Sequence, residues 1–299
     1  MENILHLPSP ISRILAPIAT EMGVELWIKR EDQIHPDLSG NKWRKLEHNL
    51  IQMKKEAKTG LLTFGGAYSN HIYATAAAGH YFNFPTIGII RGEAHTPLNP
   101  TLTYATKMGM QLHYVSRSDY RNKAQLSKQF TTKYPNYYLL PEGGTNIHAL
   151  PGCAAIIPEL EQQFPQLPDY ICLSCGTGGT LAGLLTGLQG RSHVLGFSAL
   201  KGDFHTTDIK NLLTSANHPI YTNWSIHTDY HFGGYAKTTP ELTKFIQKIK
   251  EKYQIPLERI YTAKLLYGVL DLIKKDYFKK GSKILVLHTG GLQGMRNYK

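Results

Sequence analysis

Short apolar segments typical of strands alternate with segments of helical character along this chain. The expected strands are residues 25–30, 60–64, 85–91, 111–115, 170–173, 194–198 and 283–287. Helices are expected after residue 42 and over residues 72–79, 99–109, 153–164, 181–185 and 241–253. Because a strand, a helix and a parallel strand form a right-handed βαβ unit, this order predicts an α/β fold with parallel sheets covered by helices.

Charge narrows the range of ligands. The 299 residues include 33 Lys and Arg against 22 Asp and Glu, and this net charge of +11 suits an anionic ligand. The basic residues lack a helix-turn-helix, zinc-finger or aromatic pattern, so we expect no nucleic-acid partner. No segment approaches the roughly 20 apolar residues of a membrane span. Residues 1–23 have no secretory signal pattern, which favours a cytoplasmic protein without a membrane partner.

The three cysteines, Cys153, Cys172 and Cys175, make no disulfide framework and fit a reducing cytoplasm. Cys172 and Cys175 have C-x-x-C spacing, but a zinc site needs about four ligands and there is no second pair. Cys172 also falls within an expected strand. We therefore expect neither a metal site nor a redox motif here.

Lys42 stands at the start of an expected helix. Gly40 permits a tight bend before it, and Ser39 or Asn41 could cap the helix by accepting from its backbone N–H groups. The positive helix end and two basic residues close behind lower the pKa of an ammonium. A neutral lysine can form a Schiff base with an aldehyde, which is how proteins hold pyridoxal phosphate. By itself, an ordinary solvated lysine explains this residue better.

A glycine-rich loop, residues 174–180, follows the expected strand 170–173 and precedes a helix. Backbone N–H groups of such a loop can converge on an anion, and the helix start adds its dipole, so the loop predicts a phosphate site. No Gly-Lys-Ser/Thr follows, and Leu181 stands where a dinucleotide fingerprint has its third glycine. A tight turn without a ligand remains an alternative.

Two further polar clusters follow strands, at residues 65–71 and 288–291. Ser69 and Asn70 could bind a carboxylate or the phenolic oxygen of a cofactor. There is no G-x-S-x-G, which argues against a serine hydrolase, and His71 alone is better explained as a packed or capping histidine. The carboxyl ends of strands in open α/β sheets are where ligands bind, so we expect the three clusters to converge.

These motifs, in this order, closely resemble those of the pyridoxal-phosphate enzymes of the 1-aminocyclopropane-1-carboxylate deaminase and D-cysteine desulfhydrase family. The resemblance spans about residues 25–292. It implies the tryptophan synthase β-like fold, which is fold type II of these enzymes. It also implies a homodimer, with a large cofactor domain from residues 1–44 and 144–299 and a small inserted domain from residues 45–143.

The resemblance implies a role for each site residue. Lys42 is the Schiff-base lysine, and Ser69 and Tyr261 complete the catalytic set. The residues implied to hold the cofactor are Lys42, Asn70, Cys175, Gly176, Thr177, Gly178, Gly179, Thr180, Tyr261 and Thr289. The residues implied to contact a small amino-acid substrate are Ser69, Asn70, His71, Tyr235 and Thr262.

Two positions indicate the substrate. Thr262 and Thr289 stand where cyclopropane deaminases have a glutamate and a leucine, whereas desulfhydrases have hydroxyls. A hydroxyl beside the ring nitrogen makes a weaker electron sink, adequate for a good leaving group such as thiolate. We therefore expect α,β-elimination of D-cysteine, the D configuration being implied by the resemblance only. The alternatives are deamination of 1-aminocyclopropane-1-carboxylate, dehydration of D-serine, and a cofactor-binding or phosphate-ligand-binding protein without turnover.

The chain departs from the family pattern at two points. Ala263 stands where the family usually has glycine, and Gly233-Gly234-Tyr235-Ala236 replaces a Gly-Tyr-Gly motif. Because of these differences, the sequence leaves open where Tyr235 lies within the site.

Overall fold

A six-stranded sheet forms the larger half of the protein. The computed structural model describes residues 4–38, 40–200, 202 and 205–297. The strand order is β1 (Ile11–Arg13), β2 (Glu25–Lys29), β10 (Lys283–Leu287), β7 (Tyr170–Cys175), β8 (His193–Ser198) and β9 (Trp224–His227). Only β1 runs antiparallel to its neighbour among these strands. The strands β2 and β10, which lie near opposite ends of the described chain, are therefore neighbours in one sheet.

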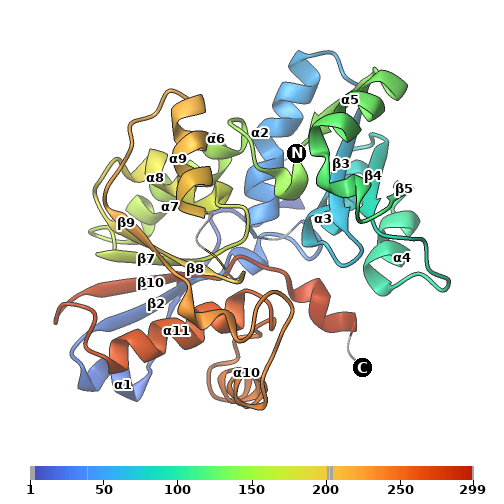
Figure 1. Ribbon diagram of the computed structural model, residues 1–299. Coiled ribbons are helices and arrows are strands. Elements are labelled where there is room, and N and C mark those ends of the chain that lie inside the picture. The colour runs from blue at the N-terminus through green and yellow to red at the C-terminus, as the bar shows by residue number, and fades with distance from the viewer. Residues whose placement is uncertain (1–3, 39, 201, 203–204, 298–299) are drawn as a thin grey trace.

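The second sheet has four parallel strands, in the order β5 (Gln111–Val115), β4 (Thr86–Arg91), β3 (Gly60–Gly66) and β6 (Tyr137–Leu140). It takes all of its strands from one continuous stretch of the chain. In Figure 1 it lies at the right of the view, apart from the six-stranded sheet. Parallel strands need a crossover of a dozen or more residues, which the intervening helices supply.

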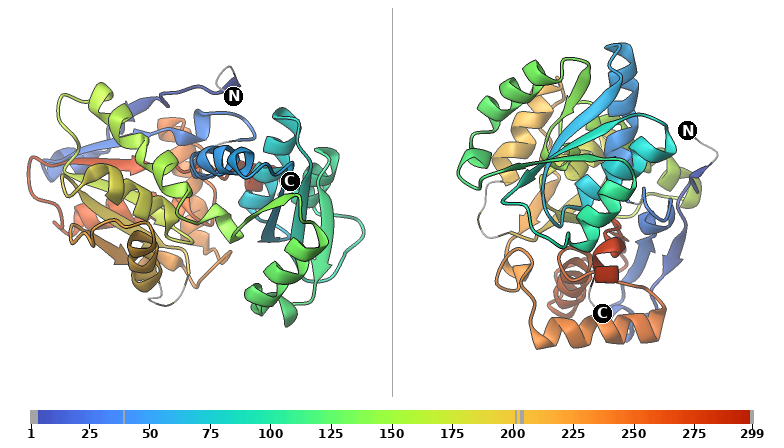
Figure 2. Two further views of the ribbon diagram at one scale, coloured as in Figure 1. Left: turned by 90° about the horizontal axis from the view of Figure 1, so that it is seen from above. Right: turned by 90° about the vertical axis from the view of Figure 1, so that its right-hand side faces the viewer.

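Helices cover both faces of the six-stranded sheet, as Figures 1 and 2 show. On one face lie α6 (Ala149–Ala154), α7 (Ile156–Gln163), α8 (Gly179–Leu188) and α9 (His205–Ser215); on the other lie α1 (Pro17–Glu21), α10 (Pro240–Tyr253) and α11 (Thr262–Lys274). Each face has its own buried apolar cluster. A parallel sheet buried on both faces needs apolar residues pointing both ways, which explains strands such as Ile-Leu-Val-Leu in β10.

The four-stranded sheet packs against α2 (Asn41–Lys55), α3 (Asn70–Tyr81), α4 (Pro100–Lys107) and α5 (Lys123–Lys133). Helix α2 lies between the two sheets and buries Trp43 and Leu46 against residues of the smaller one (Figure 1). A domain boundary at residue 45 falls inside this helix. The division into residues 1–44 with 144–299 and residues 45–143 stays a prediction.

The helix expected at residues 153–164 is wrong as a single element. Two helices, α6 and α7, meet at Ala155. Pro158 has no backbone N–H for the carbonyl of Ala154, so a continuous helix would lose a hydrogen bond at this point. The sequence pattern also missed strands β1, β6 and β9 and helices α1, α5, α9 and α11.

No helix in the described part of the chain is long and apolar enough to cross a membrane. The α/β architecture with parallel sheets and helices on both faces agrees with the expected fold class.

Candidate active site

One cavity of about 470 Å³ brings the three predicted clusters together at the carboxyl ends of β3, β7 and β10. Its size is typical of small-molecule sites. The predicted residues that line it are Lys42, Ser69, Asn70, His71, Cys175, Gly176, Thr177, Gly178, Thr180, Tyr235, Tyr261 and Thr289. Gly179 and Thr262 are not among the lining residues. Tyr235 and His71, whose orientation the sequence left open, both reach the cavity.

Lys42 is half-buried in the first turn of α2 and lines the cavity. Burial, and next the positive charge of Lys45, lower the pKa of Lys42 to about 7. Among the described residues, its amine has no hydrogen-bond or ion-pair partner. A substantial share of this amine is therefore neutral and nucleophilic at neutral pH.

The expected side-chain cap of α2 is absent at Asn41. Gly40 precedes the helix with φ +64°, and Asn41 is the first helical residue. The Asn41 amide instead donates to Thr180 Oγ1 at 3.0 Å, which links the lysine helix to the glycine loop. Ser39, the other predicted cap, lies outside the described residues.

Gly40 packs directly against the turn that carries Thr289. A Cβ atom added at Gly40 would lie 2.0 Å from the Thr289 carbonyl oxygen. The same carbonyl accepts the Asn41 N–H at 3.3 Å. The turn before Lys42 and the end of β10 are therefore held against each other, and a glycine is needed at the contact.

The glycine loop joins β7 to α8 in the way the sequence predicts. Gly178 takes a left-handed conformation, with φ +73°, and Gly179 begins the helix. Although Gly179 does not line the cavity, its N–H is one of the unpaired donors of the first helical turn. Ser174 Oγ is buried and has no partner in the described structure. This arrangement suits an anion at the helix start.

Lys45, in helix α2, is a cation that contacts this loop and that the sequence analysis did not place in the site. It lines the cavity, and its amine donates to Thr145 Oγ1 at 2.9 Å and to Thr177 Oγ1 at 3.1 Å. The same amine lies 3.2 Å from where a Cβ of Gly179 would be. Lys45 follows Lys42 by three residues, a spacing that puts both on one helix face, so the sequence did contain the signal.

Ser69 caps α3. Its hydroxyl oxygen accepts from the backbone N–H groups of His71 at 3.2 Å and Ile72 at 3.3 Å. The oxygen lone pairs serve the helix start, which leaves the O–H hydrogen free to donate into the cavity. Asn70 follows as the first residue of α3 and also lines the cavity.

The buried ring of His71 is held in one tautomer. The Thr63 hydroxyl donates to the Leu140 carbonyl at 2.8 Å and lies 2.9 Å from His71 Nε2. Since the hydroxyl hydrogen is used, Nε2 must carry the hydrogen and donate. Burial, and then the charges of Lys42 and Lys45, hold the pKa of His71 well below its ordinary value. His71 is therefore neutral, and its Nδ1 has no partner among the described residues.

Tyr261 and Tyr235 form one wall of the cavity, with their rings edge to face at 6.1 Å between centroids. Burial raises the pKa of Tyr261 well above its ordinary value, and the neighbouring Tyr235 raises it further. The Tyr261 phenol therefore stays protonated at working pH and acts as a hydrogen-bond donor.

Thr262 does not reach the cavity, against the predicted contact with substrate. It is buried, and its hydroxyl accepts the Glu258 N–H at 3.0 Å. The Glu258 carboxylate accepts from the backbone N–H groups of Ile260 at 2.6 Å, Tyr261 at 2.7 Å and Thr262 at 2.6 Å. Glu258, missed by sequence reading, thus fixes the start of α11 and the backbone of Tyr261.

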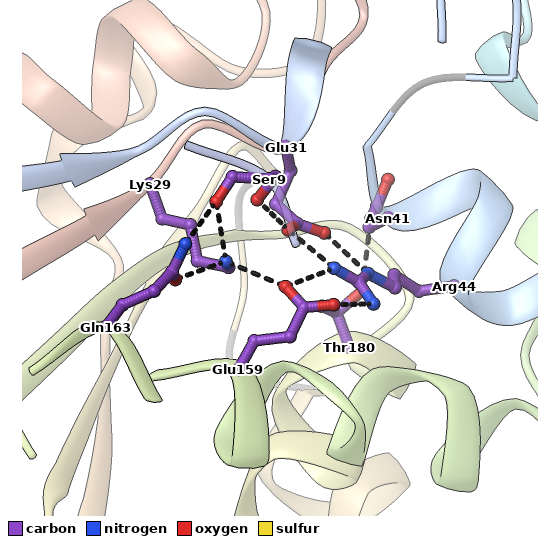
Figure 3. A network of polar contacts seen from close by, with 8 residues as sticks. All are labelled: Ser9, Lys29, Glu31, Asn41, Arg44, Glu159, Gln163 and Thr180. Carbon is purple, nitrogen blue, oxygen red and sulfur yellow. Dashed lines mark hydrogen bonds and ion pairs between the residues drawn. The ribbon is translucent and has the colours of Figure 1, made fainter. Parts of the chain in front are cut away.

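A buried ionic network supports the lysine helix (Figure 3). Arg44 donates to both carboxylate oxygens of Glu31, at 2.8 and 2.9 Å, and pairs with Glu159 at 2.8 Å. Lys29 pairs with the same Glu159 at 2.8 Å. Two cations and two anions balance in the interior, and hydrogen bonds to Ser9 and Gln163 use the remaining polar atoms. The network joins β2, α2 and α7.

The three cysteine thiols are free and buried. Burial raises the pKa of Cys153 to about 11 and that of Cys175 to about 12, so both are protonated and unreactive at neutral pH. Cys175 therefore contributes its position in the loop and no thiolate chemistry.

Comparison with known proteins agrees with this site. A family model described as pyridoxal-phosphate dependent enzyme matches residues 6–290. The chain therefore belongs to the pyridoxal-phosphate dependent enzyme family, as its lysine, glycine loop and α/β fold indicate.

Individual relatives within this family are similar to the chain over nearly its full length. The bifunctional D-cysteine desulfhydrase/1-aminocyclopropane-1-carboxylate deaminase, mitochondrial, of Arabidopsis thaliana is 31% identical over 317 residues, covering 98% of this chain and 78% of the relative. The D-cysteine desulfhydrase of Klebsiella pneumoniae is 25% identical, with 99% and 95% covered. A crystal structure of an ACC deaminase homologue matches with a TM-score of 0.86 and 28% identity, covering 98% of this chain and 92% of that one. The expected tryptophan synthase β-like fold is confirmed.

The residues present fit pyridoxal phosphate. Lys42 offers a neutral amine, and the start of α8 with the Lys45 ammonium and the unpartnered Ser174 hydroxyl offers donors for a phosphate. Thr289 lines the cavity and offers a hydroxyl for the ring nitrogen. The Glu258 carboxylate is occupied by three backbone N–H groups, so it is not free for that nitrogen.

Proposed function

We propose that this protein is a lyase that performs α,β-elimination on a small amino acid, with D-cysteine as the preferred substrate. Water and D-cysteine give pyruvate, ammonia and hydrogen sulfide. The observation that carries the proposal is the Lys42 amine, whose pKa is lowered to about 7 beside a glycine loop suited to phosphate. The activities for which these relatives are named support the same reaction class.

Lys42 is the base that this site offers for the substrate α-proton. An amine with a pKa of about 7 is partly neutral at working pH and still basic enough to accept a proton. Pyridoxal phosphate, when bound, supplies the electron sink that stabilises the charge left on the substrate α-carbon. Lys42 is also the residue that would hold the cofactor covalently.

Tyr261 and Ser69 act as donors and not as bases. The raised pKa of Tyr261 keeps its proton in place, so it can donate to the departing thiolate or to the cofactor. Ser69 already accepts two backbone N–H groups through its oxygen, so its O–H is free for the substrate carboxylate. His71 Nε2 is occupied by Thr63, which leaves the residue to act through its backbone or Nδ1.

The choice of D-cysteine depends on Thr289. A neutral hydroxyl at the ring nitrogen supplies less positive charge than a protonated nitrogen paired with a carboxylate, so the electron sink is weaker. Thiolate is a good leaving group and needs less assistance than an unactivated cyclopropane carbon. The cavity lining contains two carboxylates that could be considered as partners of the ring nitrogen, Glu142 and Asp208. Glu142 already pairs with Lys123 at 2.8 Å.

Deamination of 1-aminocyclopropane-1-carboxylate is the second candidate, since the Arabidopsis relative carries both activities in its name. The test incubates the purified protein and pyridoxal phosphate with D-cysteine, L-cysteine, 1-aminocyclopropane-1-carboxylate and D-serine. Sulfide, pyruvate and 2-oxobutyrate are measured, with Lys42→Ala as control.

We expect the protein to form sulfide and pyruvate from D-cysteine at least about tenfold faster than from L-cysteine. Equal turnover of the two enantiomers overturns the proposed preference. Release of 2-oxobutyrate as the main activity selects the second candidate, and dehydration of D-serine as the main activity selects a dehydratase. Binding of the cofactor with no turnover of any of the four makes the protein a cofactor-binding protein.

We also propose that the protein is a cytoplasmic homodimer. Three free, buried cysteines support a reducing compartment, and the family resemblance supports the dimer. Light scattering of the purified protein and fractionation of its cells test these two statements.

A further inference from the structure

One of the buried lysines, Lys264, is attached to a loop and does not line the cavity. It lies in the first turn of α11, and 2% of it is exposed. Its amine donates to the carbonyl oxygens of His231 at 2.8 Å and Gly234 at 2.9 Å. A buried ammonium is unfavourable unless it is hydrogen-bonded, so these two carbonyls keep the charged end in place. Burial lowers the pKa of Lys264 to about 8, which leaves it mainly charged at pH 7.

The two carbonyls also close two successive turns. His231 O accepts the Gly234 N–H at 3.0 Å, and Gly234 O accepts the Lys237 N–H at 3.2 Å. Gly234 belongs to both turns, and Tyr235 directly follows it. The Lys264 amine therefore binds the two carbonyl oxygens that close these turns.

The backbone of this loop needs such support. Phe232, Gly233, Gly234 and Ala236 all have positive φ, at +50°, +94°, +118° and +58°. Two of these are not glycines, and such conformations persist only where the surrounding structure fixes them. Tyr230, which directly precedes the loop, also contacts α11, because its hydroxyl donates to Asp271 at 2.7 Å.

The side chain that the loop delivers is Tyr235. It lines the cavity and is 43% exposed, with its ring edge-on to Tyr261. Tyr261 immediately precedes α11, the helix that carries Lys264. One helix start thus places both tyrosines, Tyr261 directly and Tyr235 through the amine of Lys264.

We propose that Lys264 is a positioning residue that holds the loop of residues 231–237 so that Tyr235 stands in the substrate cavity. The inference rests on the proposed function of this cavity as the reaction site. Lys264 does not line the cavity, and its effect on turnover passes through Tyr235.

A double-mutant cycle tests this path. Lys264→Met removes the donors and keeps an unbranched apolar stem, and Lys274→Met is the matched control on the same helix, at an exposed lysine. With D-cysteine as substrate, Lys264→Met and Tyr235→Ala should each lower kcat/KM by about tenfold or more. In the Tyr235→Ala background, Lys264→Met should change kcat/KM by less than about twofold. If Lys264→Met lowers kcat/KM by the same factor in the Tyr235→Ala background as in the wild type, the proposal is overturned.

Hydrogen exchange supplies a second readout that requires no substrate. In Lys264→Met, amides of residues 231–237 should exchange at least about tenfold faster, while those of β7 keep the wild-type rate. Unchanged exchange in the loop overturns the proposal even if none of the four amino acids is turned over. If Lys264→Met does not fold, Lys264→Gln, which keeps an N–H donor but is one atom shorter, replaces it in both measurements.

Discussion

The Arg44 guanidinium and the Glu31 carboxylate form two hydrogen bonds inside the protein, two residues along α2 from Lys42. Both side chains are 1% exposed. The pair therefore connects the position of the reactive lysine to the stability of the fold.

Replacing Arg44 with Met should strongly destabilise the protein. The change leaves Glu31 without its partner and removes one of the two cations on Glu159, and breaking a buried pair in this way typically costs about 3–5 kcal/mol. Urea unfolding at pH 7 measures the loss. Arg13→Met, which breaks an exposed pair with Glu25, is the control and should cost less than about 1 kcal/mol. Similar costs for the two variants would contradict this role for Arg44.

Acid should unfold the protein partly through Glu31. Burial alone would raise the pKa of Glu31, but Arg44 and Lys29 lower it below its ordinary value of 4.5. A carboxyl with a lowered folded pKa contributes stability that is complete above the unfolded pKa and is lost as the pH falls through the folded one. The free energy of unfolding should therefore decrease as the pH falls below about 4.5. In Glu31→Gln the decrease should be smaller, and an identical pH dependence would exclude Glu31 as a source.

The Lys42 amine should react at an unusually low pH. Its pKa of about 7 predicts half-maximal labelling by an amine-selective reagent near that pH in the cofactor-free protein. Peptide mass spectrometry follows the labelling. Because the charge of Lys45 contributes to the lowered pKa, Lys45→Met should raise the midpoint. A midpoint near the ordinary 10.5 in the wild type would remove the basis for Lys42 as nucleophile and base.

Gly40→Ala should reduce activity more than stability. The added Cβ would lie 2.0 Å from the Thr289 carbonyl, and the backbone has φ +64°, so the turn before Lys42 has to move away from β10. A shift of this kind displaces the amine from the cavity, and we expect about a hundredfold loss in kcat/KM. Gly190→Ala, at a positive-φ glycine with no heavy atom near the added Cβ, controls for backbone strain alone. Equal losses in the two variants would show that the contact with Thr289 is unimportant.

Periodic segments were the most predictable part of the fold. The bounds expected for residues 111–115 and 283–287 agree with β5 and β10, because polar or turn residues flank short runs in which apolar and aromatic side chains predominate. Strand β9 escaped prediction because it is a short edge strand whose residues are all half-buried, so it carries little apolar signal.

The clusters that line the cavity could be predicted because each follows a strand in the sequence. Contacts such as Lys29 with Glu159 join residues 130 positions apart, and nothing local to either indicates the other. Thr262 shows a further limit. It adjoins Tyr261, but it is the first residue of α11 and its hydroxyl accepts the Glu258 N–H, so it turns away from the cavity that Tyr261 lines.

The central position of β10 between β2 and β7 has a consequence for synthesis of the protein. Strand β10 and Thr289 leave the ribosome long after Lys42 and the glycine loop have emerged. Until then β2 and β7 have no partner in the middle of their sheet, and the amine at Lys42 faces an incomplete pocket. A nascent chain halted before residue 283 should therefore fail to retain the cofactor. Binding of pyridoxal phosphate is then a late step in the synthesis and folding of this protein.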